Sequence, residues 1–241
     1  RLDALMTRAE PVRLVDPAAV PMLEDLIAAS VARLRDYQDD ALAQRYEALV
    51  RRVADAERDK AAGAHALAEA VARNYAKLLA YKDEYEVGRL LSGEALHRQL
   101  EAQFEGDYRI AFNLAPPVLA RRDPLTGRYR KREFGAWMLP VFRLLARLKG
   151  LRGTRFDIFG YSAHRRQERA LITQYEQMLE GLLAGLEPAN HALAVKLAAL
   201  PERVRGFDVV KEKSITETDV LQERLLTEFA AARETAGSLA A

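Results

Sequence analysis

Cysteine is absent from the 241-residue sequence. Its absence excludes disulfides, thiolate nucleophiles, cysteine-based zinc sites and ordinary iron–sulfur ligation. It also suits a reducing compartment, so we expect a cytoplasmic protein. Long hydrophobic runs are missing as well, since no stretch approaches the roughly 20 apolar residues that a membrane helix needs. We therefore expect no membrane partner.

Acidic residues are scarce in one stretch of an otherwise balanced chain. Residues 121–155 contain eleven lysines and arginines but only two acids, Asp123 and Glu133, which gives this stretch a charge of +9. Since the whole chain carries +2, the remainder must carry −7. A basic block within an acidic body indicates one surface that faces an anion or a partner.

The residues that are present predict a mainly helical fold. The chain is 49% apolar and 30% charged, which is typical of a globular protein. Asp39 and Ser162 stand where side chains cap helix N-termini, and the third helix is expected to continue to Ser92-Gly93. Apolar residues recur at helical spacing over most of the sequence. We expect about seven helices, from eight helical stretches of which the fourth is short: 16–34, 39–53, 67–92, 94–105, 134–149, 162–182, 188–200 and 208–233.

A short β element is predicted in the middle of the chain. Residues 108–112 alternate with period two, as in a strand, and the Pro-Pro pair that follows ends it because proline lacks a ladder donor. Residues 121–133 include a turn-forming sequence and are expected to form a hairpin or loop with solvated basic side chains. The predicted fold is a helical domain with a small β-hairpin or strand near residues 107–132.

The sequence favours one domain over two. No internal repeat occurs at solenoid spacing, and apolar stripes on both sides of residues 106–133 need burial. We expect residues 1–241 to form a single helical domain, with 106–133 as the place where a subdivision would fall. Because the sequence starts at Arg1 without an initiator Met, it is expected to be a piece of a longer polypeptide.

The basic loop in the middle of the chain is a candidate anion site. Guanidinium groups bind phosphate oxygens through paired hydrogen bonds, so this loop could hold a phosphorylated ligand. The alternatives are a solvated run of charge and salt bridges to an acidic neighbouring domain. Nucleic acid is not expected as a partner, because the flanking helices are acidic and no recognition motif is present. The candidate residues are Arg121, Arg122, Arg128, Arg130, Lys131 and Arg132.

The polar cluster at residues 82–86 is interpreted as structural. It could dock a partner or supply an acid–base pair. Adjacent acids on a helix such as Asp83 and Glu84 point about 100° apart, however, so they do not share a target easily. A Lys82–Glu86 pair at helical spacing would support the helix instead.

No metal site and no aromatic ligand pocket are expected. Glu94, His97 and Glu101 share one helical face, but a metal site needs three or more converging ligands. Aromatic residues at this spacing are more often core than a pocket for an indole. We therefore expect core packing for Phe134, Trp137, Phe142, Phe156 and Phe159.

Several separated strings of residues occur together in one order. They are Tyr37–Asp39, Ala76–Val87, Phe112–Pro117, the interrupted run Lys131–Gly153, Asn190–Ala194 and Arg205–Phe207. As a set, over residues 36–213, they resemble the C-terminal region of indolepyruvate ferredoxin oxidoreductases, members of the 2-oxoacid:ferredoxin oxidoreductase family.

The resemblance implies a parent enzyme that oxidatively decarboxylates an aryl 2-oxoacid, acylates coenzyme A and passes electrons to ferredoxin. Such enzymes use thiamine diphosphate, bound at a Gly-Asp-Gly…Asn element, and iron–sulfur clusters on cysteines. Here Gly106-Asp107 is followed by Tyr108, and there is no cysteine. No catalytic residue of the family can be carried onto this chain. It is expected to hold no cofactor itself and to be inactive alone, with the thiamine diphosphate and the clusters in the rest of the parent enzyme.

Two functional hypotheses follow. In the first, the chain is an accessory, non-catalytic C-terminal domain that packs on the catalytic domains of the same polypeptide and helps to bind coenzyme A. In the second, it is an independent helical interaction module whose basic loop docks an acidic protein, ferredoxin included. An oligomer is compatible with both. The first predicts an association that is insensitive to salt, and the second predicts one that weakens steeply with ionic strength. We favour the first.

Overall fold

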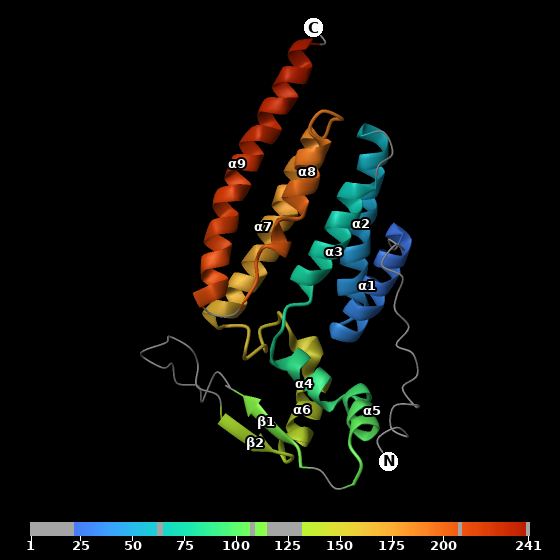
Figure 1. Ribbon diagram of the computed structural model, residues 1–241, viewed down its shortest axis with the longest axis vertical. Coiled ribbons are helices and arrows are strands. Elements are labelled where there is room, and N and C mark those ends of the chain that lie inside the picture. The colour runs from blue at the N-terminus through green and yellow to red at the C-terminus, as the bar shows by residue number, and fades with distance from the viewer. Residues whose placement is uncertain (1–21, 62–64, 107–108, 115–131, 207–208, 240–241) are drawn as a thin grey trace, which may run out of the picture.

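The computed structural model describes residues 22–61, 65–106, 109–114, 132–206 and 209–239. These residues form nine α-helices, two 3-10 helices and one antiparallel two-stranded hairpin (Figure 1). The predicted fold class is confirmed. In chain order the elements are α1 (Leu23–Tyr37), α2 (Asp40–Lys60), α3 (Ala66–Leu79), α4 (Glu84–Ser92), α5 (Glu94–Gln103), β1 (Ala111–Leu114), β2 (Arg132–Gly135), α6 (Met138–Arg147), η1 (Leu148–Leu151), α7 (Ala163–Gly185), α8 (His191–Ala198), η2 (Leu200–Glu202) and α9 (Val209–Leu239).

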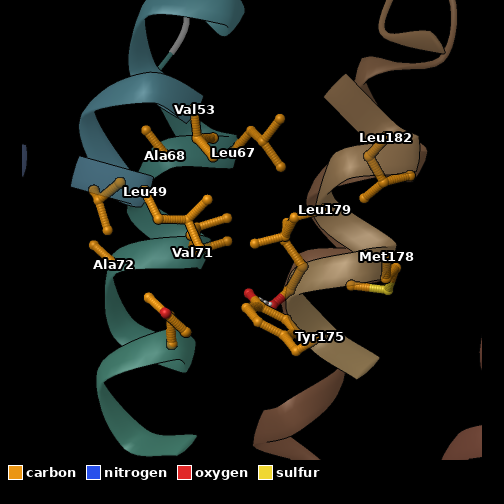
Figure 2. Close-up of a cluster of buried hydrophobic side chains, with 14 of the residues drawn as sticks. Leu49, Val53, Leu67, Ala68, Val71, Ala72, Tyr175, Met178, Leu179 and Leu182 are labelled. Atoms are coloured by element: carbon orange, nitrogen blue, oxygen red, sulfur yellow. Dashed lines mark hydrogen bonds between the residues drawn. The ribbon is translucent and has the colours of Figure 1, made fainter. Parts of the chain in front are cut away.

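The helices α1, α2, α3, α7, α8 and α9 share one apolar core. Figure 2 shows its centre, where Leu67 and Val71 of α3 face Leu179 of α7. All three side chains are fully buried. Burying a side chain of this size stabilises the fold by roughly 1.5–3 kcal/mol relative to leaving it in water, so this face holds the two halves of the sequence together.

A stack of tyrosines runs through the same core. The rings of Tyr46 and Tyr75 lie 6.0 Å apart, and those of Tyr75 and Tyr175 lie 6.2 Å apart. The hydroxyls of Tyr46 and Tyr175 donate to backbone carbonyls of α3 and α8, and that of Tyr75 donates to Glu176. Burial raises the pKa of Tyr75 and Tyr175, so both hydroxyls stay protonated as donors.

Side-chain caps begin the helices where the sequence predicts them. The Oδ1 atom of Asp39 accepts from the backbone N–H of Leu42 at 2.8 Å, and the Oγ atom of Ser162 accepts from that of Arg165 at 3.3 Å. Each satisfies an N–H group that has no partner within its helix. The expected starts of α2 and α7 are therefore confirmed.

A buried carboxylate caps α3 from a neighbouring helix. Glu57 of α2 is fully buried, and its two oxygens accept from the backbone N–H groups of Leu67 and Ala68, both at 2.8 Å. The Nε2 atom of His191, at the start of α8, lies 2.7 Å from the same carboxylate. A negative charge at a helix N-terminus is favourable, and here it ties three helices together.

The third helix of the sequence prediction is divided in two. Helix α3 ends at Leu79 and α4 begins at Glu84. Between them Asp83 adopts an extended conformation and accepts from the backbone N–H of Glu86 at 2.8 Å, which makes it the N-cap of α4. The prediction of one continuous helix was wrong because the side chain of Asp83 starts a new helix in place of extending the old one.

The hairpin and the helices α4, α5 and α6 gather at one end of the bundle, away from the C-terminus (Figure 1). Strand β1 pairs with β2 so that Phe112 lies opposite Phe134. The Pro140 that interrupts the apolar run lies in the first turn of α6, where its missing N–H costs little. No helix in the described parts of the chain is long and apolar enough to cross a membrane.

Candidate docking surface

Helix α6 is held on its inner side by α4. A Cβ atom added to Gly88 of α4 would lie 2.8 Å from both the Cβ of Leu145 and the carbonyl oxygen of Phe142, so only glycine permits this close approach. Phe142 is buried, and its ring meets that of Phe112 on β1 edge to face, with the centroids 5.0 Å apart. The inner face of α6 therefore fixes both the hairpin and α4.

A buried ion pair joins this end of the molecule to the helical bundle. The guanidinium of Arg152 contacts both carboxylate oxygens of Asp83, through Nε at 2.5 Å and Nη2 at 3.0 Å. Its Nη1 atom donates to the carbonyl of Tyr37 at 2.8 Å, and its Cζ lies 3.7 Å from the centre of the Tyr37 ring. Both charged side chains are 3% exposed, and each of the three guanidinium nitrogens makes one hydrogen bond. We call Asp83, Arg152 and Tyr37 the joint.

The electrostatics of the joint favour the ionised pair. Burial lowers the pKa of Arg152, but the hydrogen bond to Asp83, together with the electrostatic effects of Tyr37, Asp83 and Tyr81, raises the pKa above its usual value. Burial, followed by the charge of Asp83, raises the pKa of Tyr37. At neutral pH Arg152 is therefore a charged guanidinium and Tyr37 a neutral phenol.

A second carboxylate orders the loop after Arg152. Asp157 is 4% exposed, and its oxygens accept from the hydroxyl of Tyr85 at 3.1 Å and from the backbone N–H groups of Gly153 and Gly160 at 2.9 and 3.0 Å. Lys149 donates to the carbonyls of the last turn of α1. These bonds attach the chain beyond α6 to α1 and α4 at several points.

The polar cluster at residues 82–86 is engaged in structure. Asp83 belongs to the joint, and Glu84 pairs with Arg165 at 3.2 Å. Glu86 pairs with Arg89 and not, as the spacing predicts, with Lys82. Each carboxylate has a cationic partner in the fold, which supports the structural interpretation over an acid–base pair.

The outer side of α6 presents an apolar stripe to solvent. Trp137, Val141, Leu144 and Leu148 follow one another at steps of four, three and four residues, which places them on one face of the helix. Trp137 is 64% exposed and Leu144 is 56% exposed. Contiguous exposed apolar side chains of this size mark interaction sites in soluble proteins. We call these four residues the α6 stripe.

Basic side chains border the α6 stripe. Arg143 and Arg147, one turn apart on the helix, follow one edge of the stripe, and Arg155 lies in the loop beyond. All three are exposed, and none pairs with an acidic side chain within the described part of the chain. No acidic residue occurs from 134 to 156. The segment 134–156, which contains α6, is therefore positively charged.

The core prediction was wrong for part of the aromatic set. Phe142 is buried and Phe134 and Phe159 are half-buried, whereas Trp137 and Phe156 are 64% and 69% exposed. The helical spacing correctly indicated an apolar face for α6, but this helix is apolar on two sides and α4 covers only one of them. The sequence signal for the stripe was therefore available in the spacing of Trp137, Val141, Leu144 and Leu148.

The structure describes one of the six anion-binding candidates. Arg132 is the first residue of β2, exposed and paired in register with Leu114. The candidates outside the described residues are Arg121, Arg122, Arg128, Arg130 and Lys131. Anion binding by this set stays a prediction. Across the described ranges, no three metal-ligating side chains come together.

Two hollows lie away from α6. One, between α7 and α9, has a volume of about 40 Å³ and is lined mainly by apolar side chains such as Met178 and Ile215, which leaves room for little more than water. The other, of about 580 Å³, is an open groove between η2 and α9. Two acids, Glu202 and Glu217, and two arginines, Arg203 and Arg205, line it, so it favours no single ligand charge.

The comparison with protein families matches residues 23–224 to the family of unknown function DUF6537. This match covers most of the chain, from the first described helix into α9. The chain belongs to the DUF6537 family. The α6 stripe, the joint and the hairpin all lie within the part that the DUF6537 family covers. No curated protein and no solved structure matches the chain.

Proposed function

We propose that the chain is an accessory, non-catalytic C-terminal domain of an indolepyruvate (aryl 2-oxoacid):ferredoxin oxidoreductase. In this role it packs on the catalytic domains of the same polypeptide and helps to bind coenzyme A. The oxoacid chemistry takes place in those domains, on thiamine diphosphate and iron–sulfur clusters. What this chain contributes is a fixed surface on which they assemble.

One observation carries the proposal. Tyr37, Asp83 and Arg152 belong to three separate strings of the family resemblance, and they meet in the joint. The hydrogen bonds between them span 69 and 115 positions of the sequence. Sequence strings that match a family by chance are not expected to contact one another in the fold. Strings that form one structural unit are expected to do so. The joint also fixes α4 and α6, and so holds the exposed stripe in place.

The cofactors of such an enzyme do not fit this chain's own residues. Iron–sulfur clusters need thiolate ligands, and the chain has no cysteine. The Gly106-Asp107 pair is followed by Tyr108 in place of the second glycine of the diphosphate-binding element. The carboxylates at residues 83–86 are occupied by arginines. Both cofactors therefore belong to the rest of the proposed enzyme.

A second candidate function is favoured by the charge of residues 121–155. In it, the chain is an independent helical interaction module that docks an acidic protein such as ferredoxin through its basic loop. The arginines that border the α6 stripe are described members of this basic stretch, and they are exposed. Binding through exposed charges is screened by salt, because the Debye length falls from about 10 Å at 0.1 M to about 3 Å at 1 M.

Salt dependence separates the two functions. The tagged 241-residue chain is mixed with the thiamine- and cluster-binding portion of the proposed enzyme, and retention is measured at about 0.1 and about 1 M salt. Packing through apolar surface predicts equal retention at both salt concentrations. Retention of ferredoxin that disappears at the higher concentration, with no retention of the catalytic portion, would support the interaction module and contradict the accessory domain.

A further inference from the structure

We propose that the α6 stripe is the surface that binds the catalytic portion, and that its occupant is an apolar protein surface bordered by carboxylates. This inference rests on the proposed function and names the part of the chain that performs it. Three features of the described residues carry it: what the stripe exposes, how rigidly it is held, and which charges border it.

The stripe exposes the side chains that dominate protein interfaces. Trp137 at its start is 64% exposed and Leu144 at its centre is 56% exposed. Interfaces concentrate their binding energy in a few such anchors, with tryptophan and arginine enriched among them. Both residue types occur here, because Trp137 belongs to the stripe and Arg147 borders the same face of the helix. Water contact with these apolar groups is unfavourable, and a partner that covers them removes it.

The stripe is held in a fixed position before any partner arrives. Gly88 lets α4 approach the inner face of α6, and Phe142 is buried between α6 and the hairpin. The joint, through Arg152, attaches the following turn to α1 and α4. Little conformational entropy is therefore lost when the outer face is covered, which increases the affinity that a given contact area yields.

Charge decides which occupant fits. A second copy of this chain, paired through antiparallel α6 helices, would place Arg143 and Arg147 near the same arginines of the other copy, and like charges at an interface are costly. Neither of the two longer segments outside the described ranges is acidic, since residues 1–21 contain three acids and three arginines and residues 115–131 carry a net charge of +4. A partner surface that is apolar at its centre and acidic at its border complements both the apolar side chains of the stripe and the arginines beside it. The structure therefore assigns such a surface, on another part of the proposed enzyme, as the occupant of the stripe.

The test introduces a charge at the centre of the stripe. Leu144→Asp is expected to weaken binding of the catalytic portion about 100-fold, measured as the dissociation constant, because a carboxylate is forced into an apolar contact. Val220→Asp is the matched control: Val220 is 66% exposed on α9, away from α6, and its replacement is expected to leave binding unchanged. Circular dichroism and urea unfolding of both variants show that each chain is folded.

Two further variants test the arginines that border the stripe and the stripe itself, so that the test does not depend on Leu144→Asp being folded. Arg143→Glu with Arg147→Glu is expected to slow association about tenfold at low salt and to leave it unchanged at about 1 M, since border charges act mainly on the association rate. Trp137→Ala, which adds no charge, is expected to weaken binding about 30-fold.

The outcomes separate the inference from the function on which it rests. The inference and the proposed function are both supported if the wild-type chain and Val220→Asp bind the catalytic portion while Leu144→Asp and Trp137→Ala lose binding. Equal binding by the wild-type chain and the stripe variants overturns the inference and leaves the proposed function standing. Failure of the wild-type chain to bind the catalytic portion overturns the proposed function, and with it the occupant named here.

Discussion

Replacing Arg152 with alanine is expected to lower the free energy of unfolding by about 3–5 kcal/mol. The change leaves Asp83, which is 3% exposed, as an uncompensated charge in the interior. It also removes the donor to the carbonyl of Tyr37 and empties the space over the Tyr37 ring. Urea unfolding of the purified chain, followed by circular dichroism, measures the loss.

A surface ion pair provides the control for this prediction. Arg224 and Glu228 pair at 3.2 Å on α9, with side chains 70% and 47% exposed. Arg224→Ala is expected to cost less than about 1 kcal/mol, because exposed pairs are screened by water. Hydrogen exchange should also rise in α4 and α6 of Arg152→Ala, which the joint attaches to the bundle. If the two variants lost equal stability, the joint would not hold the molecule together as described.

Replacing Glu57 with alanine is expected to lower the free energy of unfolding by about 2–5 kcal/mol. The fully buried carboxylate accepts from two backbone N–H groups at the start of α3, and each donor left without a partner in the interior costs about 1–3 kcal/mol. The contact with His191 is lost as well. Thermal and urea unfolding of the variant give the change.

Glu57→Gln is the conservative comparison for that prediction, because its amide keeps one acceptor oxygen for the α3 backbone and is expected to recover part of the loss. Glu180→Ala, which removes an exposed partner of Arg52, is expected to have little effect on unfolding. A loss in Glu57→Ala no larger than that in Glu180→Ala would mean that water satisfies the α3 backbone and that the carboxylate is dispensable.

Features set by neighbouring residues were predictable from the sequence. Asp39 and Ser162 cap the helices that they were expected to cap, since a capping side chain needs only the backbone two or three positions away. The period-two alternation at residues 108–112 predicted a strand that overlaps β1, which lies at Ala111–Leu114, and the predicted small β element near residues 107–132 is confirmed. Helical spacing likewise placed Ile27, Leu34 and Val50 in the core.

Features set by distant residues were not predictable. Asp83 caps α4 through the nearby N–H of Glu86, but its contact with Arg152, 69 positions later, could not be read from the local sequence. Spacing showed that α6 is apolar, but which face is covered depends on Gly88 in a different helix. Glu84 likewise pairs with Arg165, 81 positions later. The partner of Glu86, in contrast, is Arg89, three positions away on the same helix, so the predicted pair with Lys82 was a wrong choice between two local partners. The candidate basic loop stays a prediction, with Arg132 as its described end.

The most direct test of the account is an assay of the 241-residue chain without any partner. Its central claim is that the chain supplies a surface for assembly and borrows its redox chemistry from other domains. Given an aryl 2-oxoacid, coenzyme A, thiamine diphosphate and an electron acceptor, the purified chain is expected to reduce no acceptor, whereas its complex with the catalytic portion does. Reduction of the acceptor by the chain alone would contradict the claim.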